Sequence, residues 1–318
     1  MLDQTPQSYF RIRLSTLRPD KITSFDIFIY IDKKFLTYLK AGDKLSDAKI
    51  ELLHNRDSGN SFFVAMADKE KYRLWVKEEM NSDLLSPKQK AEILRESSVA
   101  LMEDLFENPD VNKALDEAKP IITDFIQVME NTPQAMQFLI SLTGHDFYTY
   151  NHSLDVSIYA LGLGSIMGYT KKDLEELGIA ALFHDIGKRN VPLEILGKKG
   201  PLEDAEWDQM RRHPQFGLMI LNGHDNISDG VKAACFEHHE SWEGNGYPQQ
   251  ISKNEIHPFA RIVAITDTYD AMTTQRSYNH PMKPHDAVTM MKEKLASRYD
   301  PDMLKAMHSV LFKIGIHK

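Results

Sequence analysis

Histidines and aspartates beside apolar stretches are the residues of this sequence best suited to chemistry. Of the 13 histidines only His54 precedes residue 145, so imidazole groups are concentrated in the second part of the chain. Several flank apolar runs that should carry them into a core, where an unpaired polar group is costly. The candidates come from five segments: His152, His184, Asp185, His213, His238, His239 and Asp267.

Imidazole and carboxylate groups together suit iron, manganese, zinc and similar ions. These five histidines and two aspartates would serve two ions about 3.5–4 Å apart that share a carboxylate. No cysteine belongs to the set, so a structural zinc site is not expected. For any one residue alone, a histidine or aspartate satisfied by hydrogen bonds is the simpler interpretation. The joint arrangement is what predicts a metal site.

The dipeptide His-Asp needs care because it occurs four times, at residues 145, 184, 224 and 285. We interpret three of these as surface pairs. His184-Asp185 differs because it ends the apolar stretch KKDLEELGIAALF, and Lys188 follows the carboxylate by three residues. That spacing is one helical turn if the helix continues there.

The elements that must position these residues are helices. Thr170 to Asp173 resembles a capping box that opens the stretch before His184, and Gly187 is a natural stop. Strand-like sequence is nearly absent after residue 149, except for the run ARIVAI before Asp267. We therefore predict an all-α bundle with its chemistry inside.

The first part of the chain has a different character. The runs FRIRL, FDIFIYI and SFFVAM predict strands, and helices are expected from Ser46 and from Asp68. The overall class is therefore α+β, with a small α/β domain at 1–85, a helical connector at 86–144 that begins at Ser86-Pro87, and the bundle at 145–318. No acidic pair typical of a receiver domain follows a strand, so a receiver domain is not expected. We predict a regulatory or dimerising module of another kind.

Composition narrows the partners and the compartment. A net charge of −8 and a pI near 5.9 argue against binding of DNA or RNA polymers. A single cysteine, Cys235, fits a reducing compartment. Without a long apolar run or a signal-like start, the sequence predicts a cytoplasmic protein with no membrane association.

Five segments of the second part resemble the HD-GYP family of metal-dependent phosphodiesterases, which degrade cyclic di-GMP. HDIGK begins at His184, and HHESWEGNGYP begins at His238. Between them lie GKKGPL and the pair His213-Pro214, and ITDTYDAMTTQRSY begins at Ile265. The resemblance covers Tyr148 to Phe312 in matching order.

The resemblance implies two divalent ions, iron or manganese, and roles for individual residues. One ion would be bound by His152, His184 and Asp267, the other by His213, His238 and His239, and Asp185 would bridge both. A water between the ions would attack phosphorus. Lys188 would stabilise developing charge, while Arg276 and Tyr247 would contact the substrate.

Three departures from the family pattern affect this expectation. Tyr148 stands where some members have a glutamate that binds a third metal, which favours a site for two. Glu243 replaces the usual aspartate of the second signature. Ser277 and Asn279 replace a proline and a basic residue, so one phosphate contact is missing.

The main expectation is hydrolysis of cyclic di-GMP to pGpG and onward to GMP. Two alternatives stay open. One is a weakly active signalling or scaffold protein that binds nucleotide or a protein partner. The other is a hydrolase of a different cyclic dinucleotide, because metals and Lys188 recognise phosphate rather than base. A homodimer is compatible with either.

Overall fold

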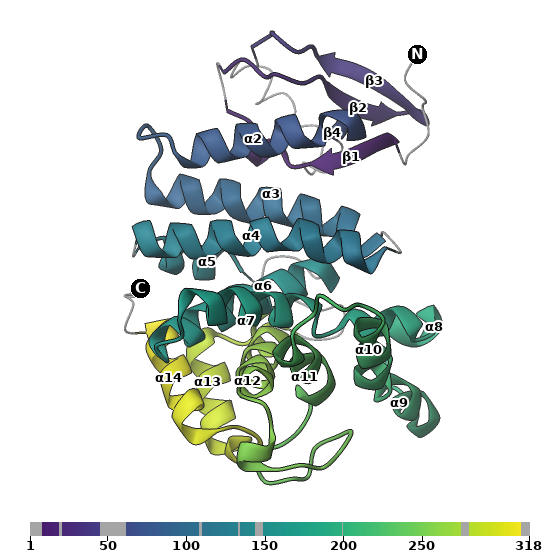
Figure 1. The fold of residues 1–318 in the computed structure, drawn as a ribbon, viewed down its shortest axis with the longest axis vertical. Coiled ribbons are helices and arrows are strands. Elements are labelled where there is room, and N and C mark those ends of the chain that lie inside the picture. Colours follow the sequence, from purple (N-terminus) through teal and green to yellow (C-terminus); the bar gives the residue numbers. More distant parts are fainter. Residues whose placement is uncertain are drawn as a thin grey trace. The chain divides into compact units, whose positions relative to one another are not determined.

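The computed structural model describes residues 8–18, 21–44, 62–107, 110–132, 134–143, 149–198, 200–274 and 280–312. The chain divides into two compact units, Met1–Pro109 and Asp110–Lys318. The first contains a small antiparallel sheet with helices, and the described residues of the second are helical (Figure 1). The predicted α+β class is confirmed.

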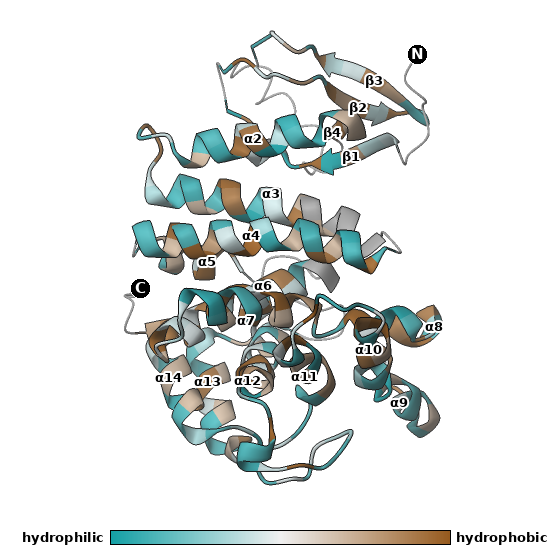
Figure 2. Cartoon of the chain, in the orientation of Figure 1, coloured by the Kyte–Doolittle hydropathy of each residue, from teal (hydrophilic) through white to brown (hydrophobic). Residues whose placement is uncertain are grey.

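Four antiparallel strands form the sheet of the first unit, in the order β1-β4-β2-β3. Strands β2 (Ile27–Ile31) and β4 (Phe62–Ala65) lie within two of the predicted runs, and β1 (Tyr9–Ile12) begins one residue before the third. Apolar residues dominate β2 (Figure 2). One face of the sheet packs against Tyr72 and Trp75. These two side chains belong to α2 (Lys69–Met80), the helix predicted from Asp68.

Strand β3 (Lys34–Leu39) was not expected from the sequence. It pairs with β2 through a turn at Asp32 and Lys33, whose φ angles are 48° and 62°. Such two-residue hairpins usually have glycine at the second position, where this chain has Lys33, so the sequence signal for the turn is weak. The helix predicted from Ser46 lies outside the described residues.

The helical stretch 86–144 is shared between the two units. Helix α3 (Pro87–Glu107) starts at the predicted Ser86-Pro87 and packs on α2 and β1 in the first unit. Helices α4 (Val111–Asn131) and α5 (Ala135–Leu142) belong to the second unit, where α4 packs on α7 (Lys171–Phe183) and α5 packs on α6 (Thr149–Ile166). The predicted domain boundaries at residues 85 and 144 stay predictions.

Helix α6 (Thr149–Ile166) lies at the centre of the second unit and is buried on all sides from residue 151 to 164. Its neighbours include α7 (Lys171–Phe183), α12 (Pro258–Thr273) and α14 (Pro301–Phe312), with α13 (Pro284–Glu293) against the last two. The capping box at the start of α7 is complete, because the Thr170 and Asp173 side chains each accept a hydrogen bond from the other's backbone N–H.

One local prediction for the second unit was wrong. The run ARIVAI is not strand-like, since it forms part of helix α12. The helix before His184 ends at Phe183, close to the predicted stop at Gly187, and a 3₁₀ turn, η4 (Ile186–Asn190), carries the chain to Lys188. None of the described helices combines the length and apolar character that crossing a bilayer requires.

Glycine at position 187 is required by the close packing of η4 on α10 (His213–Asn222). A Cβ atom there would lie 1.9 Å from the backbone oxygen of His213 and 2.4 Å from the nitrogen of Gly217. Both are backbone atoms, so the two elements would have to separate. The glycine of HDIGK therefore allows η4 and α10 to pack closely, and both elements adjoin candidate metal ligands.

We predict that Gly187→Ala destabilises the protein by about 1–3 kcal/mol, the usual cost of overpacking. The thermal unfolding midpoint, measured by circular dichroism, should fall. Gly200→Ala is the matched control, because a Cβ at Gly200 has no neighbour within 4 Å. Equal midpoints for the two variants would contradict this account.

Candidate metal centre

The ends of four helices and the middle of a fifth bring the candidate ligands together. His152 lies in α6, and His184 and Asp185 directly follow α7. His213 begins α10, and the pair His238-His239 follows α11 (Asp229–Glu237). Asp267 lies within α12. The ligand atoms form two groups, and within each group they lie within 4.8 Å of one another. The first group is His152, His184 and Asp185, and the second is His213, His238 and His239.

Asp185 lies between the histidines of the first group and those of the second, and it turns one carboxylate oxygen toward each set of histidines. Its Oδ2 atom is 3.6 Å from Nε2 of His152 and 3.3 Å from Nε2 of His184. Its Oδ1 atom is 3.3 Å from Nε2 of His213 and 3.8 Å from Nε2 of His238. This is the arrangement of a shared, bridging carboxylate.

Asp267 joins the first group. Its Oδ1 atom is 3.2 Å from Nε2 of His152 and 4.0 Å from Nε2 of His184. Its side chain is 19% exposed, whereas that of Asp185 is 1% exposed. Asp267 therefore lies at the solvent side of the cluster, and Asp185 at its base.

Backbone carbonyl groups fix the orientation of three imidazole rings. The Nδ1 atom of His184 is 2.7 Å from the Ala181 oxygen, and Nδ1 of His213 is 2.8 Å from the Met210 oxygen. His238 makes the same contact at 2.9 Å with the carbonyl of Cys235. Because a carbonyl only accepts hydrogen bonds, each Nδ1 carries the proton and each Nε2 lone pair is free for a ligand.

Asp270 plays this orienting role for His152, and the sequence analysis missed it. Its Oδ2 atom is 2.7 Å from Nδ1 of His152, while its Oδ1 accepts a hydrogen bond from Thr274 at 2.9 Å. The residue is fully buried. The spacing of Asp267 and Asp270 places them on one face of a helix. This signal becomes visible only once ARIVAI is assigned to a helix.

Most of the protonation states suit cation binding, and His152 is the exception. Burial lowers its pKa, but hydrogen bonds to the carboxylates around it outweigh this and hold the pKa well above its usual range. Burial lowers the pKa of His213 and His238, and it lowers the pKa of His239 to about 3. For Asp185, burial favours the neutral acid, but the nearby charge of Lys188 outweighs it, so the pKa lies well below the usual range. Neutral imidazoles and ionised carboxylates are the forms that bind metals.

Several buried polar atoms lack a partner among the described residues. Nε2 of His184 and Oδ1 of Asp185 accept no hydrogen bond. Nε2 of His213 and Nε2 of His238 are 3.2 Å apart, although the carbonyl contacts leave both without a proton. Two lone pairs at this distance repel unless a cation lies near them. The residues therefore fit divalent metal ions, one at each group.

The other predicted site residues lie around this cluster or outside the described residues. The Lys188 ammonium contacts Oδ2 of Asp185, and the lysine side chain is 30% exposed. The Tyr247 ring stacks on His239 with centroids 4.7 Å apart. Arg276 lies outside the described residues, as do the departures at Tyr148, Ser277 and Asn279.

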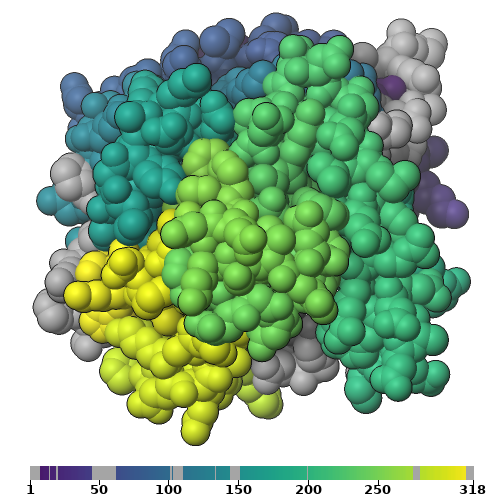
Figure 3. Space-filling view, turned by 60° about the horizontal axis from the view of Figure 1, so that its bottom comes forward, coloured from purple at the N-terminus to yellow at the C-terminus, as the bar shows by residue number. Residues whose placement is uncertain are grey.

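Tyr247 reaches His239 because the loop after α11 folds back on itself. The Glu240 carboxylate accepts hydrogen bonds from the backbone N–H groups of Gln249 at 2.6 Å and Gln250 at 3.1 Å. At Gly246 a Cβ would lie 2.4 Å from the Ser241 nitrogen, so the close return needs glycine. In the view of Figure 3, residues near 250 cover the middle of the visible face of the second unit.

Arg211 extends this edge of the cluster and was also missed from the sequence. Its guanidinium carbon lies 5.8 Å from the centre of the Tyr247 ring and 6.0 Å from the centre of the Trp207 ring. A series of flat groups thus leads outward from His239 through Tyr247 to Arg211. Such groups favour the flat face of an aromatic ligand.

Comparisons with known proteins agree with this architecture. The family model described as "HD domain" matches residues 128–303, more than half of the chain. A cyclic di-GMP phosphodiesterase of Pseudomonas aeruginosa is 33% identical over 218 residues, which are 68% of this chain and 52% of the relative. A 3′3′-cGAMP-specific phosphodiesterase of Vibrio cholerae is 30% identical over 228 residues, or 67% of this chain and 48% of the relative.

This chain therefore spans about half the length of these curated relatives. Among solved structures, an HD-GYP protein from Bdellovibrio bacteriovorus aligns with a TM-score of 0.74. The alignment covers 95% of this chain and 99% of that chain at 20% identity. At this identity the likeness shows a common fold.

We predict that Asp185→Ala abolishes stable binding at both metal positions, because it removes the one carboxylate that faces both histidine groups. Metal content after loading and desalting, measured by mass spectrometry, should fall to background. Asp286→Ala changes an aspartate that also follows a histidine but is 67% exposed, and it should keep full metal content. Full metal content in Asp185→Ala would refute the bridging role.

We predict that Asp270→Asn weakens metal binding about 10- to 100-fold, the usual effect of losing a group that orients a metal-bound histidine. The variant keeps the size of the side chain but loses the charge next to His152. Metal titration monitored by calorimetry measures the change, with exposed Asp302→Asn as the control. An unchanged affinity would remove Asp270 from the site.

Proposed function

This chain belongs to the HD domain family, and we propose that it is a phosphodiesterase that hydrolyses a cyclic dinucleotide with two divalent metal ions as cofactors. The observation that carries the proposal is the carboxylate of Asp185, which turns one oxygen to each of two histidine groups. The relatives, named for cyclic di-GMP and for 3′3′-cGAMP, support the substrate class.

We assign the ligands by their distances to Asp185 and to each other. His152, His184 and Asp267 would hold one ion, while His213, His238 and His239 would hold the second, with Asp185 shared. Iron and manganese suit this mixed set of ligands. When bound, such a pair of ions supplies a water activated near neutral pH for attack on phosphorus.

Lys188 is the proposed catalytic cation. Its ammonium lies at Asp185, and its side chain also reaches solvent, from which a phosphate can approach. A fixed positive charge there would bind a phosphate oxygen and stabilise the negative charge that develops as the ribose 3′-oxygen leaves. Arg276 is proposed for a further phosphate contact.

The flat groups beside His239 are the proposed contact for a base. Tyr247 stacks on His239, and Arg211 lies over Tyr247. A guanidinium presents two parallel donors, which match the O6 and N7 acceptors of guanine, whereas adenine has a donor in place of O6. We therefore propose cyclic di-GMP as the first substrate to test, with pGpG as product and GMP after a second cut.

The first unit contains none of the proposed site residues. We propose that it acts as a regulatory or dimerising module. Deletion of residues 1–80 should change either the activity or the oligomeric state, measured by light scattering. Unchanged values of both would refute this role.

The test of the proposed function is anaerobic loading with Fe(II) or Mn(II), followed by assays with cyclic di-GMP and 3′3′-cGAMP in parallel. About two metals per chain and the appearance of linear dinucleotide are expected. Faster turnover of 3′3′-cGAMP would replace cyclic di-GMP with 3′3′-cGAMP as the proposed substrate. Metal binding without turnover of either nucleotide would favour a binding or scaffold role.

We predict that Lys188→Ala keeps both metals but lowers kcat on the order of 10²-fold, because a charge-stabilising group is lost. Metal content and initial rates measured on the same preparation separate the two effects. Lys292→Ala, on the exposed side of α13, is the control for loss of a positive charge. A normal kcat would exclude Lys188 from the mechanism.

A further inference from the structure

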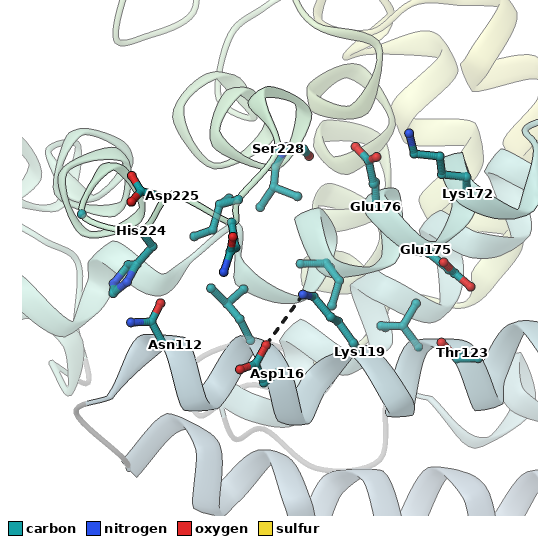
Figure 4. Close-up of a pocket in the computed structure, with 17 residues that line it drawn as sticks. Asn112, Asp116, Lys119, Thr123, Lys172, Glu175, Glu176, His224, Asp225 and Ser228 are labelled. Carbon is teal, nitrogen blue, oxygen red and sulfur yellow. Dashed lines mark hydrogen bonds and ion pairs between the residues drawn. The ribbon is translucent and has the colours of Figure 1, made fainter.

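A cavity of about 530 Å³ lies in the second unit, apart from the metal centre. It is open to solvent on one side and is bordered by α4, α7, the start of α11 and the connecting residues 223–228 (Figure 4). Pockets for small molecules usually measure 300–1,000 Å³. None of the seven candidate metal ligands lines it, so it is a separate site.

Apolar side chains form one wall of this cavity. They come from three helices and the connecting residues, which brings them together only in the folded unit. All are at least nine-tenths buried: Leu115, Ile122, Ile179, Ile227 and Val231. Such a wall suits a ligand with a hydrocarbon portion.

Carboxylates lie at both ends of the cavity. Asp225 lies with His224 at one end, and Glu175 and Glu176 lie at the other (Figure 4). These three carboxylates form no ion pair with the residues that the structure describes.

The glutamate end also contains an ammonium group, because Lys172 lies at the same end as Glu175 and Glu176 (Figure 4). Asp116 and Lys119 form an ion pair of 3.7 Å in the middle. Lys172 is the only other basic residue of the lining, apart from His224. Four carboxylates against two ammonium groups leave an excess of two negative charges, which favours a cationic ligand.

His224 adds a specific hydrogen-bonding group at the Asp225 end. Its Nδ1 atom is buried and has no hydrogen-bond partner among the described residues. A buried nitrogen without a partner is costly, and a neutral imidazole can accept a hydrogen bond there from an ammonium group.

From this lining we propose that the cavity binds a linear aliphatic amine with a cationic group at each end, that is, a diamine or polyamine. One ammonium group contacts Asp225 and His224, and the other contacts Glu175 and Glu176. The methylene chain between them packs on the apolar wall.

The proposal extends to the metal centre, because two helices take part in both sites; this part rests on the proposed function. Ile179 precedes His184 by one and a half turns of α7, and Val231 precedes His238 by about two turns along α11. Both helices therefore carry cavity residues in one part and candidate metal ligands at the C-terminal end. A ligand held between α4, α7 and α11 changes how these ends lie and thus the metal affinity.

The test is calorimetric titration of the full chain, loaded with Mn(II) at near-physiological salt, with spermidine and cadaverine. Saturable binding is expected, and n-pentylamine, which has one amine, should bind at least about tenfold more weakly because one charged contact is lost. The double variant Glu176→Gln, Asp225→Asn should lose affinity to a similar degree. Titration of Mn(II) with and without spermidine should show at least about a threefold change in metal affinity.

The matched control is Asp286→Asn, Glu293→Gln on α13, which removes the same charge at exposed positions outside the cavity. It should bind spermidine as the unmodified chain does. Equal binding by both double variants, equal binding of n-pentylamine and cadaverine, or no saturable binding would overturn the assignment of the site. An unchanged Mn(II) affinity would overturn the coupling.

Discussion

Asp185 is the group on which the organisation of the second unit depends. A buried carboxylate is stable only if positive charge or hydrogen bonds compensate it. In this chain four imidazole nitrogens lie within 4.0 Å of its two oxygens. These imidazoles come from α6, the end of α7, the start of α10 and the residue after α11. The carbonyl contacts leave Nε2 of His184, His213 and His238 without a proton, so these rings cannot donate to the carboxylate. The Lys188 ammonium compensates it, and the two proposed metal ions would do so further, which is why these helix ends meet at Asp185.

The imidazole rings are held in turn by groups that take no part in the proposed chemistry. Carbonyl oxygens at the ends of α7, α9 (Asp204–Met210) and α11 fix three rings, and the Asp270 carboxylate fixes the fourth. The candidate ligands are thereby oriented by the protein itself, and among the described residues several of their buried nitrogens and oxygens have no hydrogen-bond partner. Preorganised sites commonly trade stability for function in this way.

The metal centre and the proposed amine site use the same two helices. The metal centre lies at the C-terminal ends of α7 and α11, whereas the cavity is lined by their earlier residues and by α4. Both sites contain a buried nitrogen that has no hydrogen-bond partner in the described part of the chain, namely His184 Nε2 at the first and His224 Nδ1 at the second. The pair His224-Asp225, expected to be an incidental surface pair, thus has a defined environment.

Sequence alone determined the class of the fold and predicted the residue types of the candidate metal centre. Histidines beside apolar helices are informative because burial without a partner is costly, and the HDIGK and GYP segments added order and spacing. The tertiary structure decided which oxygen of Asp185 faces which group, and it revealed Asp270, Arg211 and strand β3. The contacts of Asp270 and Arg211 join residues far apart in the chain. Strand β3 follows a turn with positive φ angles that contains no glycine, so the sequence did not indicate it. The cavity has the same origin, because its wall exists only after α4, α7 and α11 pack together.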